Sequence, residues 1–141
     1  MDGLLNKKTE LMDLINRQKP DIVLVQETLL KSRHTFTLPN MTTYRIDREG
    51  RRGGGTAILI KRTIKHHETQ LELDNQQIET TAIRIHTNTG YIKIVSAYIP
   101  PNADTTTKDF NDLLETQEPT IIMGDLNAKH TDWGCRITNS R

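Results

Sequence analysis

The sequence predicts a mixed α/β fold, and two observations lead to that class. The first is an amphipathic segment at residues 1–18, followed after Pro20 by a continuous apolar run at residues 22–25. This order of a helix, a short turn and a strand covered on both faces is typical of layered α/β proteins. The second is a series of short runs rich in Ile, Thr and Val, separated by Asn, Gly and Pro, which indicates several further strands.

The composition limits the size and the class of the protein. The chain has 141 residues, 34% of them hydrophobic, without repeats or low-complexity tracts, so we expect one domain. Nineteen basic and eighteen acidic residues give a formal charge of +1, which excludes a global field that would attract nucleic acid. A single cysteine, Cys135, excludes an internal disulfide, and the five histidines lack the spacing of zinc ligands. We expect a soluble, intracellular chain, because the apolar runs are too short to span a bilayer.

The first third of the chain is expected to form one helix and two strands. Residues 1–18 place apolar side chains on one helical face: Leu4, Leu11, Leu14 and Ile15. Pro20 ends this helix, because the residue before a proline disfavours helical backbone. The first strand is expected at residues 22–25, an irregular segment at 31–43 and a brief strand at 44–47.

A basic, glycine-rich loop follows at residues 48–55. It contains Arg48, Arg51 and Arg52, and it ends in three consecutive glycines at 53–55. Two interpretations are open: a solvated hairpin tip, or a loop that contacts phosphate groups. It is not a phosphate-binding loop of the Walker type, because no Gly-Lys-Ser/Thr sequence follows the glycines.

The rest of the chain predicts further strands and one more helix. Four strands are expected, at residues 56–61, 66–73, 78–86 and 91–99. A helix at residues 105–115 follows, capped by Asp104 or Thr105. Its inward side chains are expected to be Phe110, Leu113 and Leu114. The apolar run at 121–123 then predicts a buried strand, which Gly124 interrupts.

Three of the predicted strands end in polar residues of kinds used in catalysis. Glu27 follows the first strand, Tyr98 lies near the end of the strand before the second helix, and Asp125 and Asn127 follow the last. Since ligands of α/β sheets bind beyond the carboxyl ends of strands, we expect these side chains to converge. Glu27 and Asp125 are suited to hold Mg²⁺ or Mn²⁺, which prefer oxygen ligands. Asn127 is suited to orient a water or a phosphate oxygen, and Tyr98 to donate to a phosphate.

Each of these residues also has a purely structural interpretation. Glu27 can be an acidic side chain at the surface, and Tyr98 a core ring with its hydroxyl at the rim. Gly124, Asp125 and Asn127 also suit a simple turn, because turns favour these residue types. If the backbone stays extended there, Asp125 and Asn127 point the same way. The combination of the four residues is what favours a functional site.

Four segments of the sequence resemble one known family, in the order in which that family has them. They are PDIVLVQET from residue 20, GGGTAI from 53, SAYIPP from 96 and GDLNAKHTDWG from 124. The chain resembles the endonuclease/exonuclease/phosphatase superfamily, and within it the endonuclease domains of non-LTR (LINE-type, jockey-like) retrotransposon polyproteins. The last segment is the most specific, because Asp-Leu-Asn continues into His-Thr-Asp-Trp-Gly.

The resemblance implies a fold, an activity and a set of site residues. The fold is a four-layer α/β sandwich with two mixed sheets facing each other, and the activity is hydrolysis of DNA phosphodiester bonds with Mg²⁺ or Mn²⁺. Glu27 matches the metal-binding glutamate, and Tyr98 the tyrosine near the scissile phosphate. Asp125 matches the aspartate that activates the water, and Asn127 the neighbouring asparagine. A reverse transcriptase in the same polyprotein and a nuclear location are also implied.

The sequence departs from the family pattern at both ends. The family begins with a strand that carries an asparagine before the first helix, and it closes with a Ser-Asp-His motif; neither is found here. We therefore expect residues 1–141 to be one domain fragment, inactive alone in the sense that it does not nick DNA at a rate near that of an intact relative. Two alternatives stay open: a degenerate remnant that cuts nothing, and a relative of AP endonucleases or phosphatases. The sequence that follows Asp125 favours the retrotransposon group over the second alternative.

Overall fold

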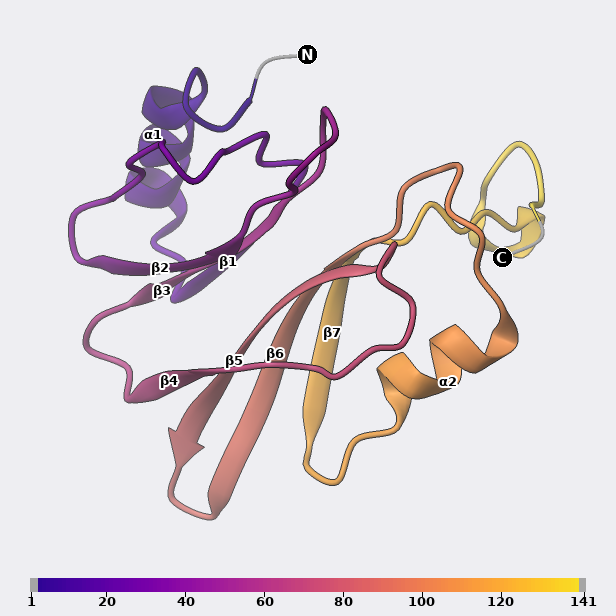
Figure 1. The fold of residues 1–141 in the computed structure, drawn as a ribbon. Coiled ribbons are helices and arrows are strands. Elements are labelled where there is room, and N and C mark those ends of the chain that lie inside the picture. Colours follow the sequence, from indigo (N-terminus) through magenta and orange to yellow (C-terminus); the bar gives the residue numbers. More distant parts are fainter. Residues whose placement is uncertain (1–2, 140–141) are drawn as a thin grey trace.

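The computed structural model describes residues 3–139 of the chain, so Met1 and Asp2, at the start of the predicted first helix, lie outside the described part. Seven strands form two sheets that face each other, flanked by two helices and a short 3-10 turn (Figure 1). The mixed α/β class with two facing sheets, expected from the sequence, is confirmed. Within residues 3–139, no helix is both long and apolar enough to cross a membrane.

The first helix, α1 (Lys8–Gln18), begins later than the sequence predicts. Residues 4–7 form turns instead of helix. Tertiary contacts fix these turns, because Leu4 is buried and its N–H donates to the Thr28 carbonyl at 2.9 Å. The helix ends as predicted before the proline, at Lys19, whose backbone is left-handed (φ 49°).

The first sheet contains β1 (Ile22–Gln26), β3 (Thr56–Lys61) and β2 (Met41–Ile46) in that order, with all neighbours antiparallel. Alternate side chains of these strands point to opposite faces. One face packs against α1 through Val23, Val25 and Leu59. The other face packs against the second sheet through Ile22, Leu24, Ile58 and Ile60.

The second sheet contains β4 (His66–Thr69), β5 (Glu79–Thr87), β6 (Gly90–Tyr98) and β7 (Thr120–Asp125) in that order. Its first three strands are antiparallel neighbours, whereas β6 and β7 are parallel. Helix α2 (Thr107–Leu114) lies in the crossover that a parallel pair requires. The tight turn between β5 and β6 makes them a hairpin, whose register pairs Glu79 with Tyr98.

The packing between the two sheets changes from apolar to polar along the strands. The apolar part is formed by the buried isoleucines Ile58, Ile60, Ile83 and Ile94. Toward one end of the sandwich the hydroxyls of Thr56 and Thr81 lie 2.7 Å apart, and Gln26 Nε2 donates to Ser96 Oγ at 2.8 Å. This end of the sandwich is therefore suited to a polar ligand.

The N-terminal cap of α2 differs from the prediction. Thr106 is the cap, not Asp104 or Thr105. Its side chain accepts the Asp109 N–H, and the Asp109 carboxylate in turn accepts the Thr106 N–H at 2.6 Å. This reciprocal pair satisfies two backbone donors that the first turn of a helix otherwise leaves unpaired, which decides where α2 begins.

Two predicted core leucines lie at the surface. Leu14 is 46% and Leu114 is 66% exposed, although both were expected to face inward. Adjacent residues on a helix point about 100° apart, and the neighbouring Ile15 and Leu113 occupy the inward positions. The strand predicted at residues 66–73 is also shorter, since it ends at Thr69.

The burial of β7 is the largest departure from the prediction. A buried strand is expected at residues 121–123, but Ile121 is 47% and Met123 is 49% exposed. Their partners in β6 are Ile94 and Ser96, so these side chains lie on the face turned toward the first sheet. β7 is the edge strand, however, and β1 is the last strand of the first sheet on this side, so the cover is incomplete.

Candidate active site

Three strand ends meet at the polar end of the sandwich. Glu27 follows β1, Tyr98 ends β6 and Asp125 ends β7. The Tyr98 hydroxyl donates a hydrogen bond to Glu27 Oε1 across the two sheets. Tyr98 and Asp125 are direct neighbours in the parallel pairing, and the Asp125 carbonyl accepts the Ile99 N–H at 3.0 Å. The structure therefore places these three residues side by side.

Asn127 is held beside Asp125 by a turn. β7 ends at Asp125, and Asn127 has a left-handed backbone (φ 48°), which asparagine tolerates. Its N–H donates to Asp125 Oδ1 at 3.0 Å, and its Nδ2 donates to the Ile99 carbonyl at 2.9 Å. The assumption of extended backbone is therefore wrong, and the turn interpretation describes this backbone correctly. The turn still keeps both polar residues at the end of one strand.

Glu27 also lies in a turn, which the sequence alone does not reveal. Its φ is 53° and that of Leu29 is 55°, a left-handed backbone that is uncommon for both residue types. The glycine segment holds this turn, since Thr28 N–H donates to the Gly55 carbonyl (3.2 Å) and Leu29 N–H to the Gly54 carbonyl (3.0 Å). A Cβ on Gly55 would lie 2.5 Å from Thr28 Oγ1, so glycine is required. The run of three glycines is the sequence signal for this contact.

The basic loop between β2 and β3 divides into a buried part and an exposed part. Its last two glycines are buried against the turn just described, whereas Arg51 and Arg52 at its tip are exposed. Arg48 points inward: its Nε donates to Glu79 Oε1, and its guanidinium carbon lies 5.6 Å from the centroid of the Tyr98 ring. The solvated hairpin tip therefore describes Arg51 and Arg52, whereas a contact between this loop and phosphate groups stays a prediction.

Glu79 belongs to this region although no motif in the sequence indicates it. It opens β5, is paired with Tyr98, and its Oε2 accepts the Gly55 N–H at 2.6 Å. The signal that could have found it is the hairpin at residues 87–90, whose register runs back along both strands to this pair.

The surroundings of Tyr98 keep its phenol protonated. The residue is 3% exposed, and burial disfavours the phenolate. The hydrogen bond to Glu27 and the charge of Glu27 act in the same direction, while the charge of Arg48 acts against them. Together they raise the pKa of Tyr98 to about 12. Tyr98 is therefore a hydrogen-bond donor at physiological pH.

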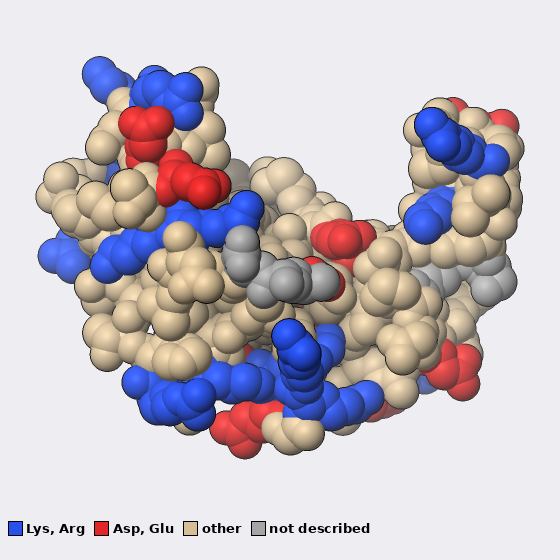
Figure 2. Space-filling view, turned by 90° about the horizontal axis from the view of Figure 1, so that it is seen from above, with Lys and Arg blue, Asp and Glu red and all other residues tan. Residues whose placement is uncertain are grey.

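A groove of about 600 Å³ opens beside Arg48 and Glu79. Its walls include Arg51 and Arg52 on the basic loop. They also include four residues with side-chain amides: Asn75, Gln76, Gln77 and Asn102. Seen from above, Lys and Arg side chains gather along one edge of the molecule with acidic side chains among them (Figure 2). Three carboxylates, of Asp47, Glu49 and Glu79, also line the groove, so only its exposed rim at Arg51 and Arg52 offers cations to a ligand that carries phosphate groups.

Comparisons with known proteins give relatives along the whole chain. The chain is 32% identical over 143 residues to a probable RNA-directed DNA polymerase from transposon X-element of Drosophila melanogaster, covering 99% of this chain and 16% of the relative. It is 26% identical over 134 residues to the RNA-directed DNA polymerase from mobile element jockey of Drosophila funebris, covering 94% of this chain and 14% of the relative. The chain thus spans 14–16% of the length of these relatives.

Solved structures share the fold. The endonuclease domain of TRAS1, a telomere-specific non-LTR retrotransposon, matches with a TM-score of 0.68 at 22% identity, over 94% of this chain and 60% of that chain. An AP endonuclease from Archaeoglobus fulgidus matches with a TM-score of 0.56 at 16% identity, over 89% of this chain and 54% of that chain.

A family model covers residues 2–141 of the chain. It describes the Endonuclease/Exonuclease/phosphatase family, the family that the four sequence segments resemble. The resemblance to this family and to the retrotransposon proteins within it is confirmed. The chain belongs to the Endonuclease/Exonuclease/phosphatase family.

Proposed function

We propose that this chain carries the DNA-nicking site of a non-LTR retrotransposon, a metal-dependent site that hydrolyses phosphodiester bonds. The observation that carries the proposal is the hydrogen bond from Tyr98 to Glu27 across the two sheets, with Asp125 paired beside Tyr98. The relatives named RNA-directed DNA polymerases support it, so the proposal includes a reverse transcriptase in the same polyprotein and action on nuclear DNA.

Each residue of the site has a role that its position allows. Tyr98 is a protonated donor, and it can exchange its bond to Glu27 for a bond to a phosphate oxygen. Asp125 is exposed at the end of β7, where it can accept a proton from an attacking water. The side-chain Nδ2 of Asn127 donates to the Ile99 carbonyl, so the Oδ1 of the same side chain is the atom that can orient this water.

The oxygen donors at this end fit a divalent cation that keeps most of its waters. Within residues 3–139, no group of three or more His, Cys, Asp or Glu side chains forms a complete metal cage. Mg²⁺ does not need one, since it binds through one or two carboxylates, waters and substrate phosphates. Glu27 is the residue that would hold Mg²⁺ or Mn²⁺, and the ion would neutralise charge on the phosphate. Enzymes of this family generally depend on divalent metal ions.

We expect the exposed arginines to contact DNA phosphates at the groove. Arg51 and Arg52 reach its rim from the loop between β2 and β3. The formal charge of the chain is only +1, so binding depends on such local contacts. We expect binding to weaken as salt rises, because each phosphate contact releases counterions.

Nicking of supercoiled plasmid with Mg²⁺ or Mn²⁺ tests the proposal, with the TRAS1 endonuclease domain run alongside. We expect slow nicking that stops with a chelator and disappears in Asp125→Ala. The rate should be at least about 100-fold below that of the TRAS1 domain, since losing one preorganised charge-stabilising donor costs about 10²–10³. This chain covers 60% of the TRAS1 structure, so donors from the rest would be missing.

Asp13→Ala is the matched control, because it removes an exposed carboxylate from α1 that pairs with Arg17. This variant should nick like the unmodified chain. Nicking that persists in Asp125→Ala would contradict the proposal.

A second readout follows the metal itself. Bound Mn²⁺ is paramagnetic and should broaden the NMR signals of the Tyr98 ring, which contacts Glu27, more strongly than those of Tyr44 and Tyr91. The broadening should disappear in Glu27→Gln. Broadening without any nicking would favour a non-catalytic remnant, and unchanged Tyr98 signals would remove Glu27 from the metal role.

A further inference from the structure

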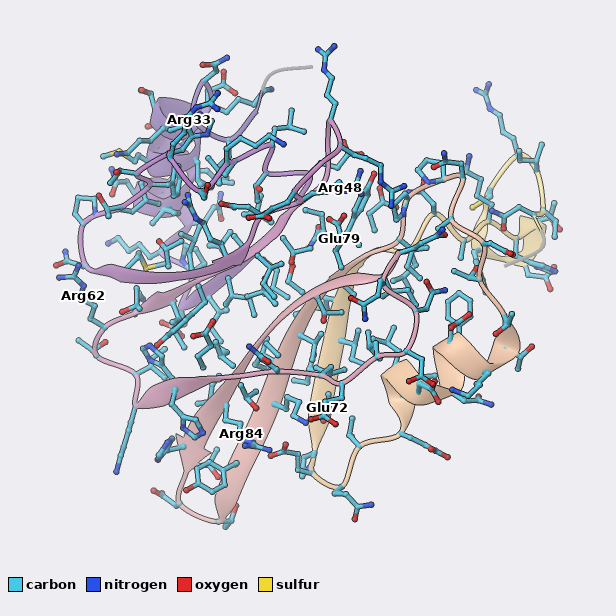
Figure 3. The ribbon with its side chains drawn as sticks, in the orientation of Figure 1. Arg33, Arg48, Arg62, Glu72, Glu79 and Arg84 are labelled. Atoms are coloured by element: carbon cyan, nitrogen blue, oxygen red, sulfur yellow. The ribbon has the colours of Figure 1, made fainter. Side chains whose placement is uncertain are left out.

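An ion pair between Arg48 and Glu79 lies directly behind the candidate site. The side chains are 18% and 13% exposed, and Arg48 Nε donates to Glu79 Oε1. Figure 3 shows the two side chains next to each other, between the loop that joins β2 to β3 and the start of β5. Burying both charges carries a desolvation penalty, so such a pair is weak grounds for a purely stabilising role. Arg48 Nη2 increases the cost of burial, because it is a buried donor without a hydrogen-bond partner in the described part of the chain.

The ion pair lies against the ring of Tyr98 through Arg48, and Glu79 is the backbone neighbour of that residue. The guanidinium carbon of Arg48 lies 5.6 Å from the ring centroid, within the range of a cation–π contact. Glu79 is the residue of β5 paired with Tyr98. With its hydroxyl bonded to Glu27, the ring is restrained at its face and at its tip.

The carboxylate of Glu79 is also connected, through Gly55, to the turn that carries Glu27. Glu79 Oε2 accepts the Gly55 N–H at 2.6 Å, and the Gly55 carbonyl accepts the Thr28 N–H at 3.2 Å. One residue of backbone therefore connects the ion pair to the residue after Glu27. Because Gly55 is buried and a Cβ there would meet Thr28 Oγ1, this connection has little room to shift.

We propose that Arg48 and Glu79 are positioning residues of the active site: their ion pair holds the Tyr98 ring and, through Gly55, the turn that carries Glu27. The inference rests on the proposed function of that site. It assigns a role in the reaction to two residues that touch neither the substrate nor the metal in the proposed mechanism.

Three variants test the pair: Arg48→Gln, Glu79→Gln and the double variant. Glutamine in place of Glu79 has one acceptor oxygen for the two donors, Arg48 Nε and Gly55 N–H, so it cannot keep both bonds. Arg48→Lys keeps the charge but loses the planar group that lies over the ring. It serves as the conservative variant if a glutamine variant folds poorly.

Glu118→Gln is the matched control. Glu118 is 18% exposed and bonds Arg84 and Lys93 of the second sheet, each at 2.8 Å, so it is also a largely buried carboxylate with two donors. It lies before β7, at the end of that strand opposite to Asp125.

The first readout is the position of the Tyr98 ring signals in NMR spectra at neutral pH. The chain has three tyrosines, so Tyr98→Phe assigns the signals. We expect the Tyr98 signals to shift in both glutamine variants and to stay in place in Glu118→Gln, with the melting temperature showing that each variant is folded. The double variant should resemble the single variants, because residues that act as one unit are not additive.

The second readout is the single-turnover nicking rate, measured at concentrations above the dissociation constant of the protein–plasmid complex. We expect a loss of about 10–100-fold in the Arg48 and Glu79 variants, the usual cost of removing a residue that orients a metal or catalytic ligand. DNA affinity is measured alongside, and a loss of rate that persists when DNA saturates the protein separates positioning from binding.

The outcomes are distinguishable from failure of the proposed function. Tyr98 signals that stay in place in both glutamine variants, or a Glu118→Gln variant that shifts them equally, would overturn the inference while leaving the function intact. Shifted signals with unchanged nicking would also overturn it. If the unmodified chain does not nick at all, the proposed function fails, and the Tyr98 signals alone decide whether the pair positions that ring.

Discussion

The two halves of the candidate site are built on neighbouring strands with very different cover. Tyr98 ends β6, where residues 94–98 are all buried. Asp125 ends β7, where Ile121 and Met123 are about half exposed. Both strands contain apolar runs, so composition does not explain the difference. Position in the sheet does, because β6 lies between β5 and β7 whereas β7 has a neighbour on one side only.

The comparison separates strand formation from burial, two properties that an apolar run is often taken to predict together. A β-branched run favours a strand, but its burial depends on what packs against it. In this chain, Tyr98 and Glu27 are restrained by packing and by hydrogen bonds from both sheets. Asp125 is restrained mainly by the β6–β7 pairing and its own turn. We therefore expect β6 to be rigid and β7 to be easily displaced.

The largest expected effect is in the covered region. Ile58→Ala removes a fully buried side chain between the two sheets and should lower the free energy of unfolding by about 2–5 kcal/mol. Ile121→Ala on β7 is the control, and its loss should be below about 1 kcal/mol because the side chain is already half exposed. Equilibrium unfolding in urea measures both. Equal losses would show that β7 is as well packed as β3.

A smaller effect is expected where β7 meets β6. Gly124 is paired with Ala97, and a Cβ on Gly124 would lie 1.7 Å from the Ala97 carbonyl oxygen. Gly124→Ala should therefore push the strands apart, cost about 1–3 kcal/mol and displace Asp125. Urea unfolding and plasmid nicking check the two consequences. The neighbouring Met123→Ala should change stability by no more than about 0.5 kcal/mol. Unchanged stability and nicking in Gly124→Ala would mean that β7 shifts without cost.

The smallest effect on stability is expected on the exposed face of β7, where the readout is association. An uncovered edge strand with apolar side chains favours pairing with another copy. Ile121→Ser with Met123→Ser should reduce self-association in sedimentation experiments and change stability by less than about 0.5 kcal/mol. Leu114→Ser removes an exposed apolar residue from α2 and is the control. An unmodified chain that stays monomeric at high concentration would show that β7 needs no further cover.

The sequence predicts local structure better than it predicts three-dimensional surroundings. The sequence places each of the seven strands of residues 3–139 through its local composition, although the ends shift: β2 begins at Met41, inside the segment predicted to be irregular. The end of α1 at Lys19 follows from a proline, which is also a local signal. The cover of β7 and the exposure of Leu14 depend on which elements pack nearby, which no single segment encodes.

In the candidate site, too, the local features can be predicted from the sequence and the three-dimensional surroundings cannot. Glu27, Tyr98, Asp125 and Asn127 can be proposed from the sequence because each lies at the end of a recognisable strand or just after it. The left-handed turn at Glu27 cannot, since glycines 27 or more positions away hold it in place. Glu79 is missed for the same reason: its partners Arg48 and Gly55 lie in the loop between β2 and β3, which belong to the other sheet.

The hydrogen bond between Tyr98 and Glu27 also sets the order in which the site can form. It joins residues 71 positions apart, whereas the β5–β6 hairpin closes through a two-residue turn. Contacts between near neighbours form early in folding, and those that close long loops come later. The bond can exist only after the two sheets have docked. A newly made or partly unfolded chain therefore holds its hairpin before it holds a working site, and any stress that loosens the docking removes the site first.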